Sequence, residues 1–341
     1  MMCARLSKKS FIKRILVISM TNIGDVVLSC PVIDILRRDF PQARIDVVVG
    51  KKAVSLFENN PHINIKIFDK QASLKQKYAW FMDLYQARYD VVVDLRRTLL
   101  GWLLRPRFAT PVLFSVPLRS LIPMSLRAPK GRSNLLTHKK DIHLNRLRQV
   151  YEYPTLSSDL TAIVTTKEDE RFFEENIAPA LQSKNFIVIA CGAADTAKRW
   201  GPHGFAVVAQ YLSGHYKIIF VGDDKDALLI NDIQGRMKTS VLSLAGKINL
   251  RQLACIIKKS SWVLCHDSGV MHLACYFDVP VVALWGPTDL AKYAPWGKKF
   301  QIVRRNEQCV RCKDPKATVA HNCMSFIEVD DVLNAVKKIE A

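Results

Sequence analysis

The chain repeats one pattern twice, with short apolar runs rich in Val and Ile alternating with longer segments of helical periodicity. In the first series we expect strands at 14–20, 44–49, 64–68 and 90–94, and helices at 25–39, 51–58 and 72–87. In the second we expect strands at 186–191, 217–221, 241–244, 262–265 and 281–284, with helical segments such as 205–212, 250–258 and 268–277. Uninterrupted apolar strands between helices are typical of parallel sheets covered on both faces. The pattern therefore predicts an α/β chain with two Rossmann-like domains.

The length agrees with two domains, because 341 residues are about twice the size of an ordinary single domain. The segment 156–184 is mixed and acidic, and we expect it to hold a strand and a helix before the second series starts. We therefore expect an N-terminal domain at 1–160 and a C-terminal domain at 161–341. The last helical segment, 329–339, follows the final strand, and one option is that it packs back on the first domain.

The net charge of +19 is unevenly distributed. Residues 1–150 hold 27 basic and 10 acidic side chains, whereas residues 151–341 hold 23 and 21. Within 101–150 the count is 10 basic to 1 acidic. The first domain is therefore expected to face a strongly anionic partner, and the second a ligand that is recognised locally.

Cysteine usage and hydropathy indicate a cytoplasmic protein. The nine cysteines are an odd number, and several lie inside apolar runs, which favours a reducing compartment. The apolar run Ile15–Ile18 is too short for the core of a signal peptide. No stretch approaches the roughly 18 uninterrupted apolar residues of a transmembrane helix.

Polar residues follow the first strand where a ligand would bind in a parallel α/β domain. Gly24 permits a tight turn, and Asp25 places a carboxylate at the start of the next helix. The alternative interpretation is that Asp25 only complements the helix dipole. The loop is not the GxGxxG fingerprint of dinucleotide-binding enzymes, which argues against a redox enzyme.

Three further loops follow strands of the second series. Small residues at 192–197 would let the backbone approach a ligand, and Lys198 with Arg199 could reach phosphate groups; a solvated basic pair is the alternative. One carboxylate of the pair at 223–224 could hold a ribose diol, although one of the two could instead cap a helix. The cluster at 266–272 opens a helix, where Ser and Gly suit a phosphate.

Taken in order, these motifs resemble the ADP-heptose:lipopolysaccharide heptosyltransferases, glycosyltransferase family 9. The motifs are Asn-Ile-Gly-Asp at 22–25, Lys-Arg-Trp at 198–200, Asp-Ser-Gly-Val-Met-His at 267–272 and Val-Pro-Val-Val-Ala-Leu-Trp-Gly-Pro-Thr at 279–288. The resemblance runs from about residue 14 to about residue 338. It implies the GT-B architecture, in which two Rossmann-like parallel-sheet domains face each other across a cleft, with the acceptor on the first and the nucleotide sugar on the second.

The resemblance also implies roles for particular residues. Asp25 would be the general base on the acceptor hydroxyl, in the loop that also holds Asn22 and Gly24. Apart from the resemblance, we also assign the basic residues Arg96 and Arg97 to the acceptor side of the site. The donor site would contain Lys198, Asp224, Ile248, Asp267, Ser268, Gly269 and His272. Among these, Lys198 and the Ser268–Gly269 turn would contact phosphate, Asp224 the ribose, and Ile248 the adenine. The family needs no metal or other cofactor, and no DxD-type motif occurs in a suitable loop here.

The region between Asp94 and Leu144 departs most from the family's pattern. Basic residues there alternate with large apolar ones, which suits an anionic membrane surface that carries a phosphorylated glycolipid. A solvated basic face over ordinary core helices is the alternative. We therefore expect a peripheral association with the inner face of the inner membrane.

Cys309, Cys312, His321 and Cys323 have the ligand types of a Cys3His zinc site. Their spacing is shorter than in a usual zinc ribbon, and a similar Cys-rich loop recurs in the resembling family without a catalytic role. We therefore expect no metal in the transfer site and leave zinc binding by this group open.

The sequence thus predicts an inverting, metal-independent glycosyltransferase that moves a heptose from ADP-heptose to a lipopolysaccharide inner-core acceptor. One alternative is a transferase of the same fold with another nucleotide sugar or glycan acceptor. A second alternative is a basic RNA-binding protein, but aromatic RNA-binding motifs are missing. We therefore expect no nucleic-acid partner.

Overall fold

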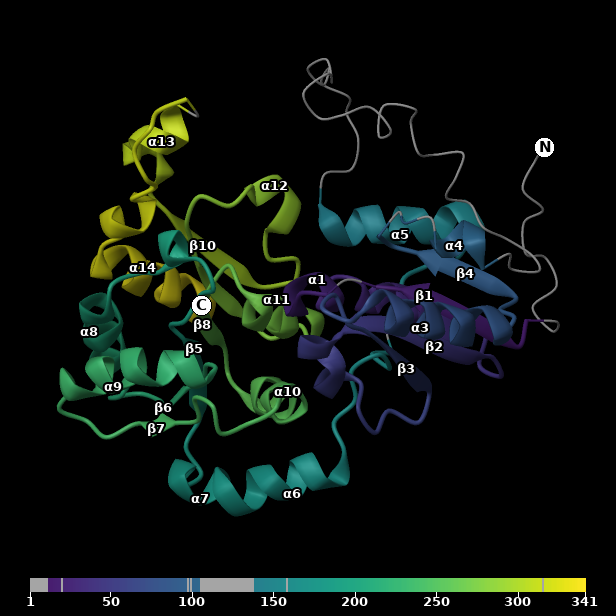
Figure 1. Cartoon of the computed structure of the whole chain (residues 1–341). Helices are drawn as coiled ribbons and strands as arrows, with labels where there is room; N and C mark the ends of the chain where they lie inside the picture. Colours follow the sequence, from purple (N-terminus) through teal and green to yellow (C-terminus); the bar gives the residue numbers. More distant parts are fainter. Residues whose placement is uncertain are drawn as a thin grey trace. The chain divides into compact units, whose positions relative to one another are not determined.

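The structure, a computed structural model, describes residues 12–19, 21–96, 98, 100–104, 138–157, 159–314 and 316–341. The chain divides into unit 1, residues 1–164, and unit 2, residues 165–341. Each unit contains one parallel β-sheet (Figure 1). The predicted fold class, two parallel-sheet α/β domains, is confirmed. Among the described residues, each helix is too short or too polar to cross a lipid bilayer.

Unit 1 has a four-stranded sheet in the order β3-β2-β1-β4. Its elements are β1 (Arg14–Ile18), α1 (Ile23–Val27), α2 (Cys30–Asp39), β2 (Arg44–Gly50), the 3-10 helix η2 (Lys51–Leu56), β3 (Ile63–Phe68), α3 (Leu74–Gln86), β4 (Val91–Asp94), α4 (Leu100–Leu103) and α5 (Lys139–Val150). All four strands were predicted from their apolar runs, because the central ones are buried on both faces.

The helix expected at 25–39 is divided into α1 and α2. Ser29 is the N-cap of α2, and Pro31 lies in the first turn of that helix. Proline has no N–H to donate and is tolerated in a first turn, whereas in a helix interior it breaks the ladder. A new helix therefore starts just before Pro31, and α1 remains a short separate helix after the first strand.

The strand expected between 156 and 184 is absent from the described residues of that range, which contain α6 (Lys167–Asn176) and α7 (Ala178–Leu181). Thr161 and Ala162 lead into a short apolar stretch, but their backbone groups bond to side chains of unit 1. Both N–H groups donate to Asp34 Oδ1 at 2.8 Å, and both carbonyls accept from Asn60 Nδ2. This segment therefore belongs to unit 1, and the predicted boundary after residue 160 lies slightly before the observed division.

Unit 2 has a six-stranded sheet in the order β10-β9-β8-β5-β6-β7. Besides α6 and α7, its elements are β5 (Phe186–Ala190), η5 (Thr196–Lys198), α8 (Pro202–Leu212), β6 (Lys217–Phe220), η6 (Asp224–Asp226), α9 (Ala227–Gly235), β7 (Leu242–Ser243), α10 (Leu250–Lys259), β8 (Val263–His266), α11 (Gly269–Tyr276), β9 (Val281–Trp285), α12 (Leu290–Tyr293), β10 (Phe300–Arg304), η7 (Asn306–Gln308), α13 (Val310–Lys313), η8 (Cys323–Phe326) and α14 (Val329–Glu340). Strand β10 was not predicted, because only one of its five residues is buried.

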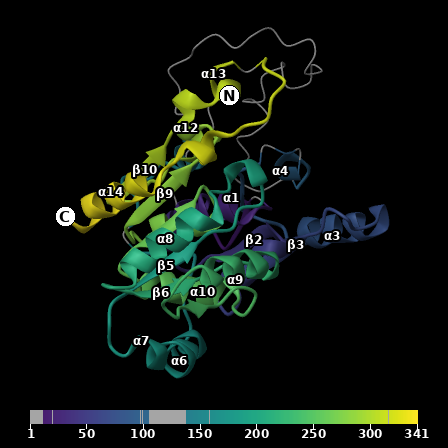
Figure 2. The same cartoon turned by 90° about the vertical axis from the view of Figure 1, so that its left-hand side faces the viewer.

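Helices cover both faces of the second sheet. Residues of α8, α9 and α14 form one hydrophobic cluster with the side chains that β5, β8 and β9 direct to that face. Figure 1 shows α10 and α11 on the other face. Helix α14 contacts β9, β10 and α8, and Figures 1 and 2 show it beside the sheet of unit 2. The buried residues of α14 thus belong to the core of unit 2, and the option that this segment also packs on the first domain stays a prediction.

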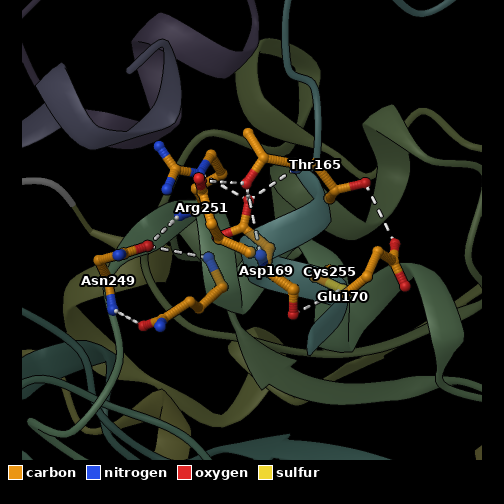
Figure 3. A network of polar contacts seen from close by, with 9 residues as sticks. Thr165, Asp169, Glu170, Asn249, Arg251 and Cys255 are labelled. Carbon is orange, nitrogen blue, oxygen red and sulfur yellow. Dashed lines mark hydrogen bonds and ion pairs between the residues drawn. The ribbon is translucent and has the colours of Figure 1, made fainter. Parts of the chain in front are cut away.

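A buried ion pair joins the start of unit 2 to α10 (Figure 3). Arg251 Nε lies 2.6 Å from Asp169 Oδ2, and these side chains are 9% and 2% exposed. Asp169 also caps α6 reciprocally with Thr166, and Asn249 caps α10. The network therefore fixes α6 against the N-terminal end of α10.

Arg251→Met should destabilise unit 2 by about 3–5 kcal/mol, because it leaves the Asp169 carboxylate buried without its cation. The matched control is Arg236→Met, which breaks the solvent-exposed Arg236–Asp232 pair and should cost less than about 1 kcal/mol. Thermal denaturation of the full chain measures both effects. Similar small losses in the two variants would show that the buried pair does not hold α6 in place.

Candidate functional site

The candidate ligand site of unit 2 lies on the loops after β5, β6 and β8. These three strands are parallel, with β5 paired to β8 on one side and β6 on the other. The loops that follow them therefore start at the same edge of the sheet. This arrangement brings together the loops at 192–199, 222–226 and 267–272, which the sequence analysis selected separately.

Two of the predicted residues form an ion pair at this edge. Lys198 Nζ lies 2.7 Å from Asp267 Oδ2, and the Asp267 side chain is 6% exposed against 25% for Lys198. Asp267 directly follows β8, and Lys198 is the last residue of η5. The carboxylate thus fixes the position of the lysine, whose ammonium group stays in partial contact with solvent and can meet an anion.

His266 holds both ends of the loop that carries Lys198. Its Nε2 accepts a hydrogen bond from the Trp200 backbone N–H at 2.9 Å, and its Nδ1 lies 3.4 Å from the Gly192 carbonyl oxygen. Burial lowers the pKa of His266 to about 4, so the imidazole is neutral near pH 7. A neutral ring with its proton on Nδ1 satisfies both contacts. The sequence analysis did not assign this role, because it rests on residues far apart in the chain.

The N-terminus of α11 offers further groups for an anion. Ser268 is the N-cap but makes no side-chain capping bond, and its hydroxyl is buried with no hydrogen-bond partner among the described residues. The first N–H groups of a helix, starting here at Gly269, attract negative charge. His272 lies within the first turn and its side chain is buried. The predicted Ser268, Gly269 and His272 are thus together, next to Asp267.

The adjacent residues Asp223 and Asp224 make different contacts. Asp223 Oδ1 accepts hydrogen bonds from the N–H groups of Lys225 and Asp226, at 3.0 and 3.2 Å, and so caps η6. Asp224 is exposed, and its Oδ1 lies 2.0 Å from where a Cβ on Gly246 would be. Gly246 has φ +68°, a conformation that favours glycine. Both side chains are exposed, but the Asp223 carboxylate is engaged in capping, so we expect Asp224 to be the one that contacts a ligand.

Asp226 connects two of the loops and was missed by the sequence analysis. A Cβ on Gly192 would lie 2.1 Å from its Oδ2, and a Cβ on Gly222 would lie 2.7 Å from its Cβ. The Asp226 side chain thus packs directly against both glycines, and burial raises the pKa of its carboxyl group.

Ile248, which was predicted to belong to the donor site, is half-buried and lies in the chain between Gly246 and the start of α10.

The candidate site of unit 1 is formed by the loops after β1 and β4, which are neighbouring parallel strands. Asn22 is the N-cap of α1, Gly24 and Asp25 lie in its first turn, and the Asn22 side-chain amide donates to Asp25 Oδ2 at 3.4 Å. Asp25 is half-buried. Its carboxylate therefore lies at the helix N-terminus, as the dipole interpretation requires, and also remains accessible to a ligand.

The loop after β4 is shaped by a buried carboxylate. Asp94 accepts hydrogen bonds from the N–H groups of Arg96 and Thr98 and from the Thr98 hydroxyl, at 2.7–2.8 Å. The Arg96 guanidinium lies 5.6 Å from the centre of the Phe68 ring. Arg97 and the basic segment 105–137 lie outside the described residues, so their predicted roles stay predictions.

Among the described residues, one group of side chains has the composition and proximity to hold a metal ion. It consists of Cys309, Cys312, His321 and Cys323, whose ligand atoms all lie within 4.8 Å of one another. The group belongs to the segment after β10 and contains none of the predicted site residues.

Three groups lie at the edge of the unit 2 sheet where its strands end. They are the ammonium group of Lys198, the N-terminus of α11 and the exposed carboxylate of Asp224. The first two are suited to a diphosphate, and the third to a sugar diol. Unit 1 offers a half-buried carboxylate that could accept a proton. The arrangement suits transfer from a nucleoside diphosphate donor.

Residues 81–321 match the model of glycosyltransferase family 9 (heptosyltransferase). Among curated proteins, a lipopolysaccharide heptosyltransferase 3 of Escherichia coli is 26% identical over 93% of this chain and 96% of its own length.

Two solved structures show the same fold over nearly the whole chain. A glycosyl transferase of family 9 from Veillonella parvula has a TM-score of 0.74 and 24% identity, and covers 96% of this chain and 97% of its own. E. coli heptosyltransferase WaaC with ADP has a TM-score of 0.68 and 16% identity, and covers 95% and 99%.

Lys198→Ala should weaken the binding of ADP, used as a nucleoside diphosphate probe, by about tenfold to a hundredfold, because a charge-assisted contact to phosphate is lost. The control is Lys225→Ala, which removes an exposed lysine from the next loop. Isothermal titration calorimetry measures both affinities. An unchanged affinity in Lys198→Ala, or an equal loss in the control, would exclude Lys198 from the site.

Proposed function

This chain belongs to glycosyltransferase family 9, the heptosyltransferases, and we propose that it transfers a heptose from ADP-heptose to a hydroxyl of a lipopolysaccharide inner-core acceptor. The observation that carries the proposal is the convergence of the Lys198–Asp267 pair, the α11 N-terminus and Asp224 at one sheet edge. The similarity to a lipopolysaccharide heptosyltransferase and to an ADP-bound heptosyltransferase supports this choice of donor and acceptor.

Unit 2 binds the donor in this proposal. Lys198 and the N–H groups after Ser268 contact the diphosphate, and His272 lines the same pocket. Asp224 holds the ribose hydroxyls, while Ile248 packs against the adenine. Asp267 acts through Lys198 by fixing its ammonium group, since a carboxylate in direct contact with phosphate would be repelled.

Unit 1 binds the acceptor and supplies the base. The acceptor oxygen forms a bond to the anomeric carbon on the face opposite the diphosphate, and its proton passes to the Asp25 carboxylate. The bond from the anomeric carbon to the phosphate oxygen breaks with its electron pair, so that ADP leaves and the configuration inverts. Lys198 and the helix N-terminus stabilise the charge that develops on the leaving group. No metal takes part in this step.

The proposal is tested by the masses of the products from a truncated lipopolysaccharide acceptor. The full chain should add one heptose from ADP-heptose and should react poorly with UDP- and GDP-sugars. Asp25→Asn should lower turnover by about a hundredfold to ten-thousandfold with ADP affinity nearly unchanged, because only the acceptor proton loses its base.

The matched control is Asp159→Asn, which removes the same charge from an exposed position of unit 1 and should keep full turnover. Turnover near the wild-type rate in Asp25→Asn would mean that this residue only stabilises its helix. Preferred transfer from another nucleotide sugar would refute the donor assignment.

The proposal also places the enzyme in the cytoplasm, at the inner face of the inner membrane, where the anionic acceptor is embedded. Its basis is the charge of residues 101–150, where 10 basic side chains accompany 1 acidic one. Near an anionic leaflet each basic residue can contribute about 1 kcal/mol, and salt screens the attraction.

Replacing Arg119, Arg127, Lys130 and Arg132 by Ser should lower cosedimentation with anionic vesicles and raise the apparent Michaelis constant for a lipid-embedded acceptor. Turnover on a delipidated acceptor should change much less. The control removes four exposed lysines of unit 2, Lys184, Lys225, Lys238 and Lys338. Equal binding to neutral and anionic vesicles, or equal losses in the two variants, would assign the charge another role.

A further inference from the structure

The segment after β10 brings three cysteines and one histidine to a single point. Cys309 and Cys323 are fully buried, and Cys312 and His321 are half-buried. Cys309 precedes α13, Cys312 lies within it, and Cys323 begins η8. Figures 1 and 2 show α13 at the end of unit 2 opposite α6 and α7.

The separations of these atoms have the dimensions of a tetrahedral metal site. Ligands that bind zinc at about 2.3 Å for sulfur and about 2.0–2.1 Å for nitrogen lie roughly 3.5–3.8 Å apart at tetrahedral angles. His321 Nδ1 lies 3.4 Å from Cys312 Sγ and 3.8 Å from Cys309 Sγ, and the Sγ atoms of Cys312 and Cys323 lie 3.9 Å apart. Ligand types, number and spacing therefore agree.

The surroundings also fit a metal centre. The side-chain amide of the buried Asn306 donates to Cys312 Sγ at 3.4 Å and to the Gly286 carbonyl oxygen at 3.0 Å. N–H groups that bond to ligand sulfur orient the thiolate and stabilise its charge. Asn306 thus connects the four ligands with the loop that follows β9.

We propose that Cys309, Cys312, His321 and Cys323 bind one structural Zn²⁺ ion. Three thiolates and one imidazole complete a tetrahedral coordination, so no position remains for a substrate or water. The metal therefore takes no part in glycosyl transfer, and this inference does not depend on the proposed function.

The bound ion would stabilise the segment that packs against the Lys198 loop. A Cβ on Gly286 would lie 3.1 Å from Met324 Sδ and 3.3 Å from the Ala197 carbonyl oxygen. Trp200 Nε1 also donates to the Ile327 carbonyl at 2.8 Å. Met324 and the Ala197 carbonyl thus both lie against Gly286, and Ile327 bonds to Trp200, so this segment lies beside the loop that carries Lys198. The zinc would fix the segment through the adjacent Cys323.

The metal content of the full chain tests the proposal, with protein purified without a chelator or a histidine tag. Mass spectrometry of the elements should find about one zinc per chain. Growth with Co²⁺ should give the intense visible bands of tetrahedral cobalt together with sulfur-to-cobalt charge transfer. This second measurement needs no variant, so it does not depend on whether a mutant folds.

Variants then locate the metal. Cys312→Ser and His321→Ala should lose the zinc and show a lower melting temperature, whereas His321→Cys should retain the metal with a more thiolate-rich cobalt spectrum. The control is Cys255→Ala, which removes a buried cysteine of α10 outside the group and should keep the metal.

Three results would overturn the proposal. The first is a chain without zinc that also fails to give the tetrahedral cobalt spectrum, and the second is zinc that persists in both Cys312→Ser and His321→Ala. The third is one equivalent of iron in place of zinc, which thiolate sites can also bind.

Discussion

The proposed donor site depends on two contacts that the neutral imidazole of His266 makes. The ring spans the loop after β5, because it joins the Gly192 carbonyl at one end to the Trp200 N–H at the other. Its burial keeps it uncharged, so each ring nitrogen has one defined role as donor or acceptor. The next residue, Asp267, holds Lys198 in the same loop. His266 and Asp267 thus fix the backbone of this loop and the position of the Lys198 ammonium group in it.

The neighbouring loops are fixed by close contacts between aspartates and glycines. Asp226 fills the space that side chains at Gly192 and Gly222 would need, and Asp224 lies over the backbone of Gly246. Each contact requires a residue without a Cβ, which explains why glycine follows the strands at these points. The two adjacent acids are both exposed but differ in their contacts, since Asp223 caps η6 and Asp224 lies against Gly246.

The strands and the loops after them could be predicted, because a buried parallel strand has a continuous apolar run and ligand loops follow its carboxyl end. The roles of His266 and Asn60 could not be predicted, because their partners lie 66 and more than 100 residues away. The strand expected within 156–184 is missing for a related reason, since apolar composition does not reveal that the backbone of Thr161 and Ala162 bonds to Asp34 and Asn60 instead of to a neighbouring strand. The sequence showed that three cysteines and one histidine could be metal ligands, but the distances between their ligand atoms are known only from the fold.

In the proposed function, one edge of the second sheet holds the nucleotide. Hydrogen–deuterium exchange of the full chain, with and without ADP, maps that site directly. We expect slower exchange in the segments 192–200, 222–226, 246–249 and 267–272. The first turn of α11 should be protected most, because its N–H groups contact the diphosphate in the proposed complex. Protection confined to unit 1 or to residues 309–323, with unchanged exchange in these four segments, would contradict this assignment.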